Sequence, residues 1–265
     1  MLARPLESVL KHDRTVILAG LAGITALAWV YMFYLAWAMQ PMDMGAMEMD
    51  MGQAMTRIQV WGAVELLLTF VMWAIMMVAM MVPSAAPMIL LFATINRKLH
   101  QQNRPHVATS IFLAAYLLVW TLFSVLATLV QWGLHSAALL SPMMVSTNPI
   151  LGGTLLIAAG VFQWTPLKLA CLEHCRAPFD FLMTDWREGN RGAFLMGLNH
   201  GAYCLGCCWF LMGLLFVAGV MNLLWVAAIA LFVLVEKVAP GGPLVGRLTG
   251  ALLVAVGIAL LTQGF

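Results

Sequence analysis

Long apolar segments are the feature that most constrains how this chain can fold. Most of them approach the length of about 20 residues that a helix needs to cross a lipid bilayer. The sequence is 63% hydrophobic and 9% charged, whereas soluble domains carry about 25% charged residues, so a water-soluble fold would lack a polar surface. We therefore predict an all-α, polytopic membrane bundle of about seven helices, near residues 15–38, 58–82, 107–132, 150–167, 193–218, 222–237 and 248–264.

The distribution of basic residues predicts how these helices are oriented. With seven spans and a cytoplasmic N-terminus, twelve Lys and Arg residues lie on the inner side and only Arg57 lies outside. This is a strong positive-inside bias. Prolines at 83 and 87 raise the alternative that 58–95 forms two short spans rather than one span and an interfacial helix. The extra crossing would move the basic residues of 97–104 outside, so we favour seven spans in a bacterial inner (plasma) membrane.

We expect a single transmembrane domain over residues 1–265. The sequence contains no internal repeat, low-complexity linker or separate soluble domain. Residues 1–14 are too polar for a cleavable signal peptide and no small-residue cleavage site is evident, so the first helix is expected to remain. The longest outer polar segment is then the loop at 39–57.

This predicted outer loop is rich in methionine. Between Met39 and Met55 it holds seven methionines, three acidic residues and no lysine or arginine. Thioether sulfur is a soft ligand suited to Cu(I), and the carboxylates would concentrate cations near it. The alternative is a flexible loop rich in a common apolar residue. We favour soft-metal capture, with candidate ligands Met44, Met47, Met49 and Met51.

The second apolar segment carries a methionine stripe and one carboxylate. Its methionines recur every three to five residues and so lie mostly along one side of a helix. Methionine also fills ordinary packing gaps, so core packing and a metal conduit both stay open. Glu65 is costly within a span, which leaves cation binding, proton coupling or a structural hydrogen bond as its role. The candidate ligands here are Met72, Met76, Met80 and Glu65.

The strongest chemical signal lies in the fifth apolar segment. His200, Cys204, Cys207 and Cys208 are separated by steps of mostly three or four residues, so they share one helical face near the middle of the bilayer. Imidazole and thiolate bind Cu(I) or Zn(II). Membrane cysteines are often only small buried hydrophobes, but three cysteines and a histidine within nine residues favour a metal site.

A second cluster follows the fourth segment, on the predicted inner side. Cys171, His174 and Cys175 place three soft ligands within about one helical turn. A disulfide between the two cysteines is the alternative, but a reducing cytosol disfavours it and five cysteines leave one unpaired. Further along the chain, the adjacent Glu236 and Lys237 are interpreted as a structural ion pair.

These motifs together resemble a bacterial family of predicted metal-binding integral membrane proteins. The resemblance covers roughly residues 65–250, and its most specific element is the Cys207-Cys208-Trp209 motif after His200-Gly201 and Cys204. Other matching stretches are the methionine run before Pro83, the Cys171…Cys175-Arg176-x-Pro178 loop and Gly219-Val-Met221-Asn222. The resemblance implies a membrane metal site in these motifs and supplies no reaction. The outer loop is also similar, by analogy alone, to the outer segments of eukaryotic copper importers.

The leading hypothesis is a Cu(I)-binding membrane protein that acts in copper uptake, transfer or storage, with zinc as a second possible metal. Two alternatives remain open: a membrane thiol–disulfide oxidoreductase, and an accessory subunit or copper-loading factor of a membrane oxidase or oxygenase complex. No nucleotide-binding loop is visible, so ATP-driven export by this chain alone is not expected. The expected partners are the lipid bilayer, the metal ion and a copper chaperone or membrane-complex subunits, with no nucleic acid.

Overall fold

The computed structural model describes residues 3–38, 61–100, 108–137 and 149–263, and within these ranges the chain forms helices and no β-strand. The helical bundle predicted from the sequence is therefore confirmed. The methionine-rich loop lies outside the described residues, and with it the candidate ligands Met44, Met47, Met49 and Met51. In chain order the helices are α1 (Ala3–Ala38), α3 (Ala63–His100), α4 (Thr109–Ser136), α5 (Pro149–Phe162), α6 (Pro166–Arg176), α7 (Pro178–Thr184), α8 (Gly189–Gly213), α9 (Leu215–Ala218), α10 (Leu223–Val238) and α11 (Gly242–Gln263).

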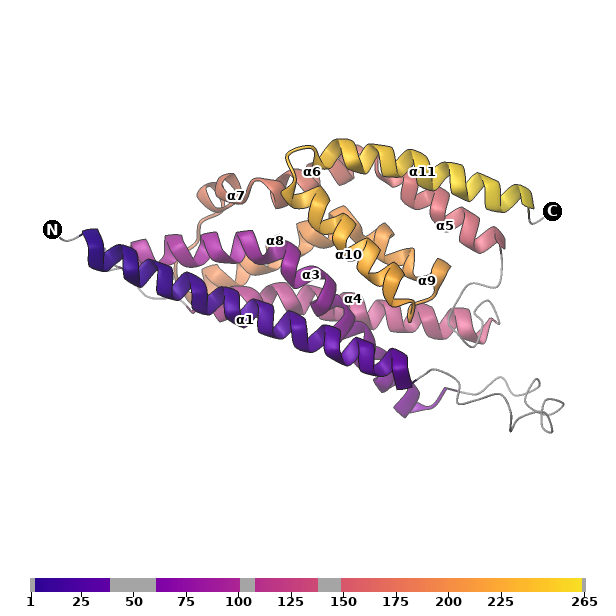
Figure 1. The fold of residues 1–265 in the computed structure, drawn as a ribbon, viewed down its shortest axis with the longest axis horizontal. Helices are drawn as coiled ribbons and strands as arrows, with labels where there is room; N and C mark the ends of the chain where they lie inside the picture. The colour runs from indigo at the N-terminus through magenta and orange to yellow at the C-terminus, as the bar shows by residue number, and fades with distance from the viewer. Residues whose placement is uncertain (1–2, 39–60, 101–107, 138–148, 264–265) are drawn as a thin grey trace.

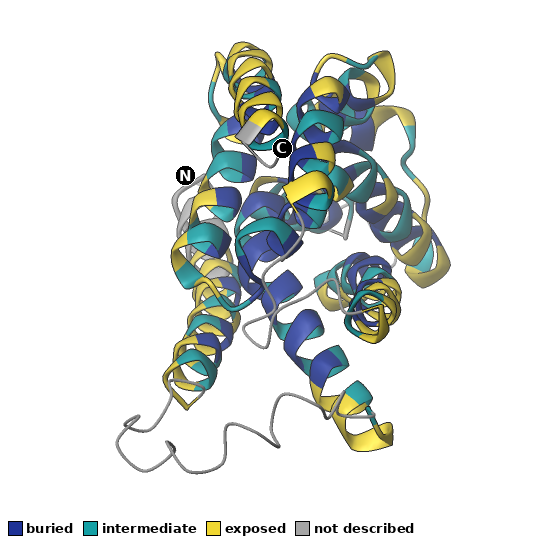
Figure 2. Cartoon of the chain, turned by 90° about the vertical axis from the view of Figure 1, so that its right-hand side faces the viewer, coloured by how far each residue is buried: buried dark blue, intermediate teal, exposed yellow. Residues whose placement is uncertain are grey.

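The long helices lie roughly along the long axis of the molecule (Figure 1). Helix α3 packs against α1 on one side and against α4 on another, and α4 packs along α8. Helices α5 and α11 form a separate pair at one edge, while α10 lies between that pair and α3. Buried residues face the interior of this arrangement and exposed ones face outward (Figure 2). The exposed side chains include many large apolar ones, such as Leu27, Trp37, Leu224 and Leu248.

Among the residues that the structure describes, five helices are long and apolar enough to cross a membrane: α1 from Arg14, α3, α4, α8 with α9, and α11. Helices α5 and α6 pass the same test as a pair, with a bend of 64° between them. Each of the seven predicted segments coincides with a helix, but α10 has 16 residues, fewer than the about 20 that a straight span requires. The count of seven spans thus stays a prediction.

Helix α3 runs through both of its prolines without interruption, so the predicted break at Pro83 is wrong. Proline removes a backbone donor and usually kinks a helix, but neighbouring side chains can supply hydrogen bonds at such points. Here the hydroxyls of Ser84 and Tyr116 both donate to the backbone oxygen of Met81, at 2.9 and 3.2 Å. Side-chain hydroxyls therefore meet the α3 backbone beside its first proline.

Glycines bring α5 and α11 into close backbone contact. A Cβ atom on Gly160 would lie 2.6 Å from the backbone oxygen of Gly250, and one on Gly257 would lie 2.8 Å from that of Gly153. Both distances are shorter than van der Waals contact, so neither position has room for a side chain. Small residues that allow such approach are typical of packed helices in membranes.

Two basic residues counted in the inner loops are buried instead. Lys168 on α6 is 1% exposed and Lys237 on α10 is 7% exposed. A loop lysine would be solvated, whereas these two have partners inside the bundle, described below. They are therefore not the solvated loop residues that the positive-inside comparison counts, and each needs a partner inside the bundle.

Candidate metal site

All five cysteines of the chain gather where α6 packs against α8. Cys204, Cys207 and Cys208 on α8 are each at most 1% exposed. The Cys175 thiol lies within hydrogen-bonding reach of Cys204 and Cys207. On the preceding turn of α6, Cys171 Sγ would lie 2.8 Å from a Cβ atom on Gly206, so this sulfur packs directly over that glycine. The two cysteine clusters that the sequence suggested are one cluster in space.

The local sequence explains how α6 reaches α8. Helix α6 begins with Pro166, which is favourable in a first turn, and the side chain of Thr165 caps it by accepting a hydrogen bond from the Lys168 backbone N–H. The bend after α5 turns α6 toward α8. Gly206 then leaves space for Cys171. We use the name thiol cluster for the four sulfurs that lie together, those of Cys175, Cys204, Cys207 and Cys208.

All five cysteines are free thiols, so the alternative of a disulfide between Cys171 and Cys175 is not formed in this structure. The Cys207 and Cys208 thiols both donate to the backbone oxygen of Cys204, at 3.1 and 2.9 Å. Among the residues that the structure describes, no group of three or more His, Cys, Asp or Glu side chains is arranged to hold a metal ion. A metal held by three sulfurs would therefore require rotation of these thiols.

The Cys204 sulfur is the most strongly contacted member of the thiol cluster. The Lys237 ammonium donates to it at 2.9 Å, and the Tyr116 hydroxyl shares a hydrogen bond with it at 3.1 Å. Lys237 also donates to the Ser84 hydroxyl at 3.2 Å. Residues from α4, α6 and α10 thus converge on this α8 sulfur, and α3 joins them through the contact of Ser84 with Lys237. Sequence reasoning missed Lys237, Tyr116 and Ser84, because no spacing rule connects residues so far apart in the chain.

The predicted ion pair between Glu236 and Lys237 is wrong, because the two side chains point to different partners. Glu236 pairs with Lys168 on α6, with 2.8 Å between the ammonium nitrogen and the carboxylate. Lys168 also donates to the side-chain oxygen of Gln163. Neighbouring positions on a helix diverge by about 100°, so adjacent residues on α10 reach separate interfaces.

His200 lies one turn before Cys204 on α8 and is 3% exposed. Its ring packs among Phe112, Tyr116 and Phe181 at centroid distances of 5.6 to 6.1 Å. The Nδ1 atom is buried and has no hydrogen-bond partner. Buried polar atoms are rarely left unpaired, so this nitrogen is available to a ligand and fits the predicted role of His200.

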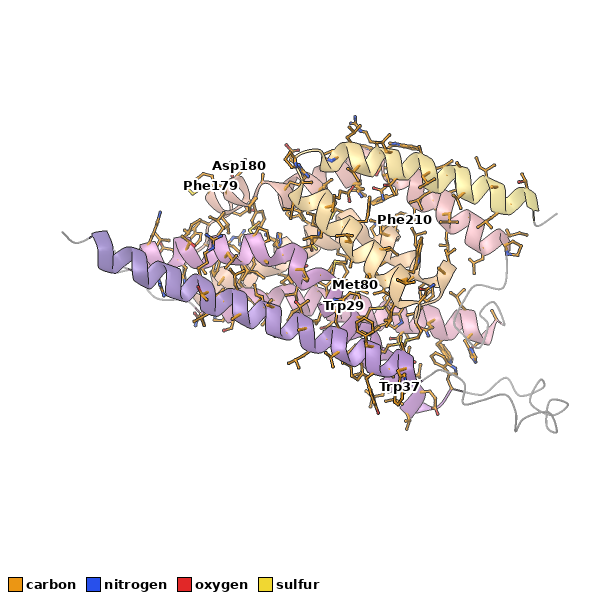
Figure 3. All side chains as sticks on the ribbon, in the orientation of Figure 1. Trp29, Trp37, Met80, Phe179, Asp180 and Phe210 are labelled. Atoms are coloured by element: carbon orange, nitrogen blue, oxygen red, sulfur yellow. The ribbon has the colours of Figure 1, made fainter. Side chains whose placement is uncertain are left out.

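His174 is directed to a different environment from its neighbouring cysteines. Its ring stacks on Tyr203 at 4.1 Å with an interplanar angle of 7°, and Nδ1 contacts the backbone oxygen of Ala170 at 2.8 Å. It also lines a pocket of about 250 Å³ together with Glu173, Asp180 and Asp185. Asp180, on α7, lies toward the end of the molecule where α1 begins (Figure 3). None of the contacts described for His174 is with a sulfur of the thiol cluster, so its role as a metal ligand stays a prediction.

The methionine stripe of α3 lies in the core. Met72, Met76 and Met80 are at most 3% exposed and belong to the same buried apolar cluster as Cys204. Figure 3 shows Met80 in the interior of the bundle. This burial suits core packing and also leaves the sulfurs inside the protein, so a role of the stripe as metal ligands stays a prediction.

Glu65 forms a structural hydrogen bond, one of the three roles that the sequence left open, while cation binding and proton coupling stay predictions. It is exposed in the first turn of α3, and its carboxylate accepts a 2.9 Å hydrogen bond from the backbone N–H of Gly62. An acidic side chain in this position satisfies an unpaired donor and interacts favourably with the helix dipole. None of its hydrogen bonds connects it to the thiol cluster.

The fold and the site define a helical protein with apolar, potentially membrane-crossing helices around a buried thiol cluster. The model of the PpoB2 copper chaperone family matches residues 70–260, which is more than half of the chain, and the chain belongs to this family. The predicted connection to copper is thereby confirmed. No curated protein and no solved structure matches the chain.

Proposed function

We propose that this chain is an integral membrane protein that binds Cu(I) at the thiol cluster and transfers it to an acceptor protein. The observation that carries the proposal is the convergence of Cys175 from α6 with Cys204 and Cys207 from α8. Thiolates are preferred ligands of Cu(I). Membership of a copper chaperone family supports copper as the metal, and the five long apolar helices support insertion into a membrane.

Four cysteines are a ligand set that both Cu(I) and zinc accept, so the sulfurs alone do not distinguish the two metals. Membership of a copper chaperone family favours Cu(I). The cluster offers thiols on two helices, and His200 adds an unpartnered nitrogen one turn away. Because Cys207 and Cys208 donate to a backbone oxygen in the structure, we expect them to rotate toward the ion when it binds.

The outer methionine loop and the α3 stripe complete the proposed route. Thioethers would capture Cu(I) at residues 39–57 and hand it along the buried methionines to thiolates, which bind it more tightly. The direction of this transfer is that of increasing ligand affinity. Replacing Met44, Met47, Met49 and Met51 together by Leu should therefore slow copper loading at low copper concentration without changing the final stoichiometry.

The proposal is tested by the Cu(I) stoichiometry of the purified chain in detergent. We expect stoichiometric Cu(I) in competition with a Cu(I) chelator, and loss of that binding in Cys204→Ser. Cys171→Ser is the matched control, since its sulfur packs over Gly206 rather than within the thiol cluster. Equal copper binding by the wild type and Cys204→Ser would contradict the proposal, as would a preference for Zn(II).

A second candidate function is thiol–disulfide exchange. The contact of Lys237 and Tyr116 with Cys204 resembles the cationic surroundings that activate reactive thiolates, and Cys175 and Cys207 lie nearby as exchange partners. Family membership ranks it below copper binding. Treatment with an oxidised quinone followed by alkylation mapping of the denatured chain tests it: protection of Cys175 together with an α8 cysteine would favour exchange, and full alkylation of all five would exclude it.

A further inference from the structure

Lys237 is a buried cation in the middle of a candidate cation site. Its ammonium donates to Cys204 Sγ at 2.9 Å and to Ser84 Oγ at 3.2 Å, and the residue is 7% exposed. It also interacts electrostatically with Cys175, Cys207 and Cys208. The position of the lysine within the thiol cluster is thus set by α10, while the sulfurs come from α6 and α8.

Within the described part of the chain, no carboxylate forms a salt bridge with Lys237. The adjacent carboxylate of Glu236 is directed to Lys168. A buried ammonium without a counter-ion is strongly unfavourable, and the Ser84 hydroxyl supplies a dipole but no charge. Glu236 also interacts electrostatically with Lys237, but its carboxylate is already paired with Lys168. The groups left to balance the charge of Lys237 are therefore the cysteine sulfurs, with Cys204 in direct contact.

We infer that Lys237 determines which metal the thiol cluster accepts, by fixing one positive charge beside the sulfurs; this rests on the proposed copper binding. With two of the four cysteines of the thiol cluster ionised, the two thiolates, Lys237 and a monovalent soft cation together carry no net charge. A divalent cation on the same ligands leaves one excess positive charge. Because net charge in a low-dielectric interior is costly, the lysine favours the monovalent ion.

The effect of Lys237 on metal selectivity depends on how many thiolates bind the ion. A divalent ion held by three thiolates is neutral in the presence of Lys237, and removal of the lysine would then weaken the divalent ion. Two-thiolate binding predicts the reverse, because without Lys237 two thiolates neutralise a divalent ion. The two ligand sets therefore respond to the same substitution with opposite selectivity.

The test is a comparison of Cu(I) and Zn(II) affinities, by chelator competition, for the full chain and three variants. Lys237→Met should weaken Cu(I) binding roughly tenfold to hundredfold and leave Zn(II) binding unchanged or stronger. Lys237→Arg keeps the charge and should stay close to the wild type in its Cu(I)-to-Zn(II) ratio. Ser84→Ala removes the uncharged partner of Lys237 and should change that ratio less than threefold.

The outcomes separate this inference from the function it rests on. If the wild type binds Cu(I) through Cys204 but Lys237→Met has the wild-type selectivity, the role of Lys237 is refuted and copper binding stands. A parallel loss of both metals in Lys237→Met, without rescue by arginine, would also overturn it by indicating a structural role. If Cys204→Ser binds Cu(I) normally, the proposed function itself fails. Thermal unfolding in detergent identifies any variant that does not fold.

Discussion

Two buried lysines of this protein are neutralised in different ways. Lys168 on α6 has a carboxylate partner, Glu236, and an amide partner, Gln163. Lys237, the residue after Glu236, instead has the Cys204 sulfur and the Ser84 hydroxyl as its partners. A carboxylate paired with an ammonium is held as a fixed ion pair, whereas a thiol exchanges readily between proton, metal and sulfur. The first region is therefore suited to hold helices together, and the second to bind and release a cation.

Two glycines next to Glu236 are required by the close packing of the first region. A Cβ atom on Gly246 would lie against the Glu236 carboxylate, and one on Gly242 would meet the Glu236 backbone oxygen. Arg176 donates to this same backbone oxygen and, at 3.1 Å, to that of Pro240. The turn between α10 and α11 is thereby tied to α6, which carries Cys175. The contacts around Glu236 therefore help to hold α6, and with it Cys175, in place beside the α8 cysteines.

The largest effect is expected when the carboxylate of the first region is removed. Glu236→Gln leaves Lys168 buried without a counter-ion, which should destabilise the fold by about 3–5 kcal/mol. Thermal unfolding in detergent, followed by circular dichroism, measures the effect. The fraction that remains folded should still bind Cu(I).

The double variant Lys168→Met with Glu236→Gln is the control for that prediction. It removes both charges, so it should recover part of the lost stability. A Glu236→Gln variant with normal stability and no copper binding would reverse the assignment, because it would place the metal chemistry in the first region.

The second prediction tests which of two neighbouring residues on α6 belongs to the metal site. Cys175→Ser should weaken Cu(I) binding by at least the roughly 10- to 100-fold that outer-shell changes cost, because Cys175 lies against Cys204 and Cys207. His174→Ala should bind as the wild type does, because its ring stacks on Tyr203. Chelator competition measures both. Equal losses in the two variants would mean that His174 turns toward the cluster.

A smaller effect is expected from the hydroxyl that touches Cys204. Tyr116→Phe removes hydrogen bonds to Cys204 Sγ and to the Met81 backbone oxygen, at a cost of about 1 kcal/mol each. Cu(I) affinity should fall about fivefold, with little change in stoichiometry. Tyr203→Phe, which keeps the ring that stacks on His174, is the matched control. No change in Tyr116→Phe would show that this hydroxyl has no influence on the sulfur.

The smallest effect is expected far from both regions. Glu65→Ala removes a cap of the α3 N-terminus and should cost about 0.5 kcal/mol. The number of Cu(I) ions per chain should stay the same. A loss of bound copper in this variant would restore Glu65 as a ligand and would show that the metal chemistry extends beyond the thiol cluster.

Local sequence patterns predicted what lies on one helix, and little of what lies between helices. The long apolar segments indicated the long helices but not the short helix α7, and the spacing of His200 and Cys204 placed them one turn apart. The break expected at Pro83 did not occur, because α3 continues through that residue. Near the proline, the Tyr116 hydroxyl from α4 donates to the backbone oxygen of Met81, and no local rule would have found this contact because Tyr116 is remote in sequence.

The same reasoning explains the misassigned charges of α10. Adjacency in sequence suggested that Glu236 pairs with Lys237, but consecutive helical residues face different directions. A useful signal was present: two opposite charges near the end of an apolar segment each require a partner from elsewhere. The candidates for those partners were Lys168 and the cysteines, both already visible in the sequence.

X-ray absorption at the copper edge of the Cu(I)-loaded chain tests most directly the claim that sulfurs from α6 and α8 hold one ion together. We predict a first coordination shell dominated by sulfur, with fewer sulfur neighbours in Cys175→Ser and in Cys204→Ser. A shell of nitrogen and oxygen alone, or a sulfur shell that neither substitution alters, would contradict the account.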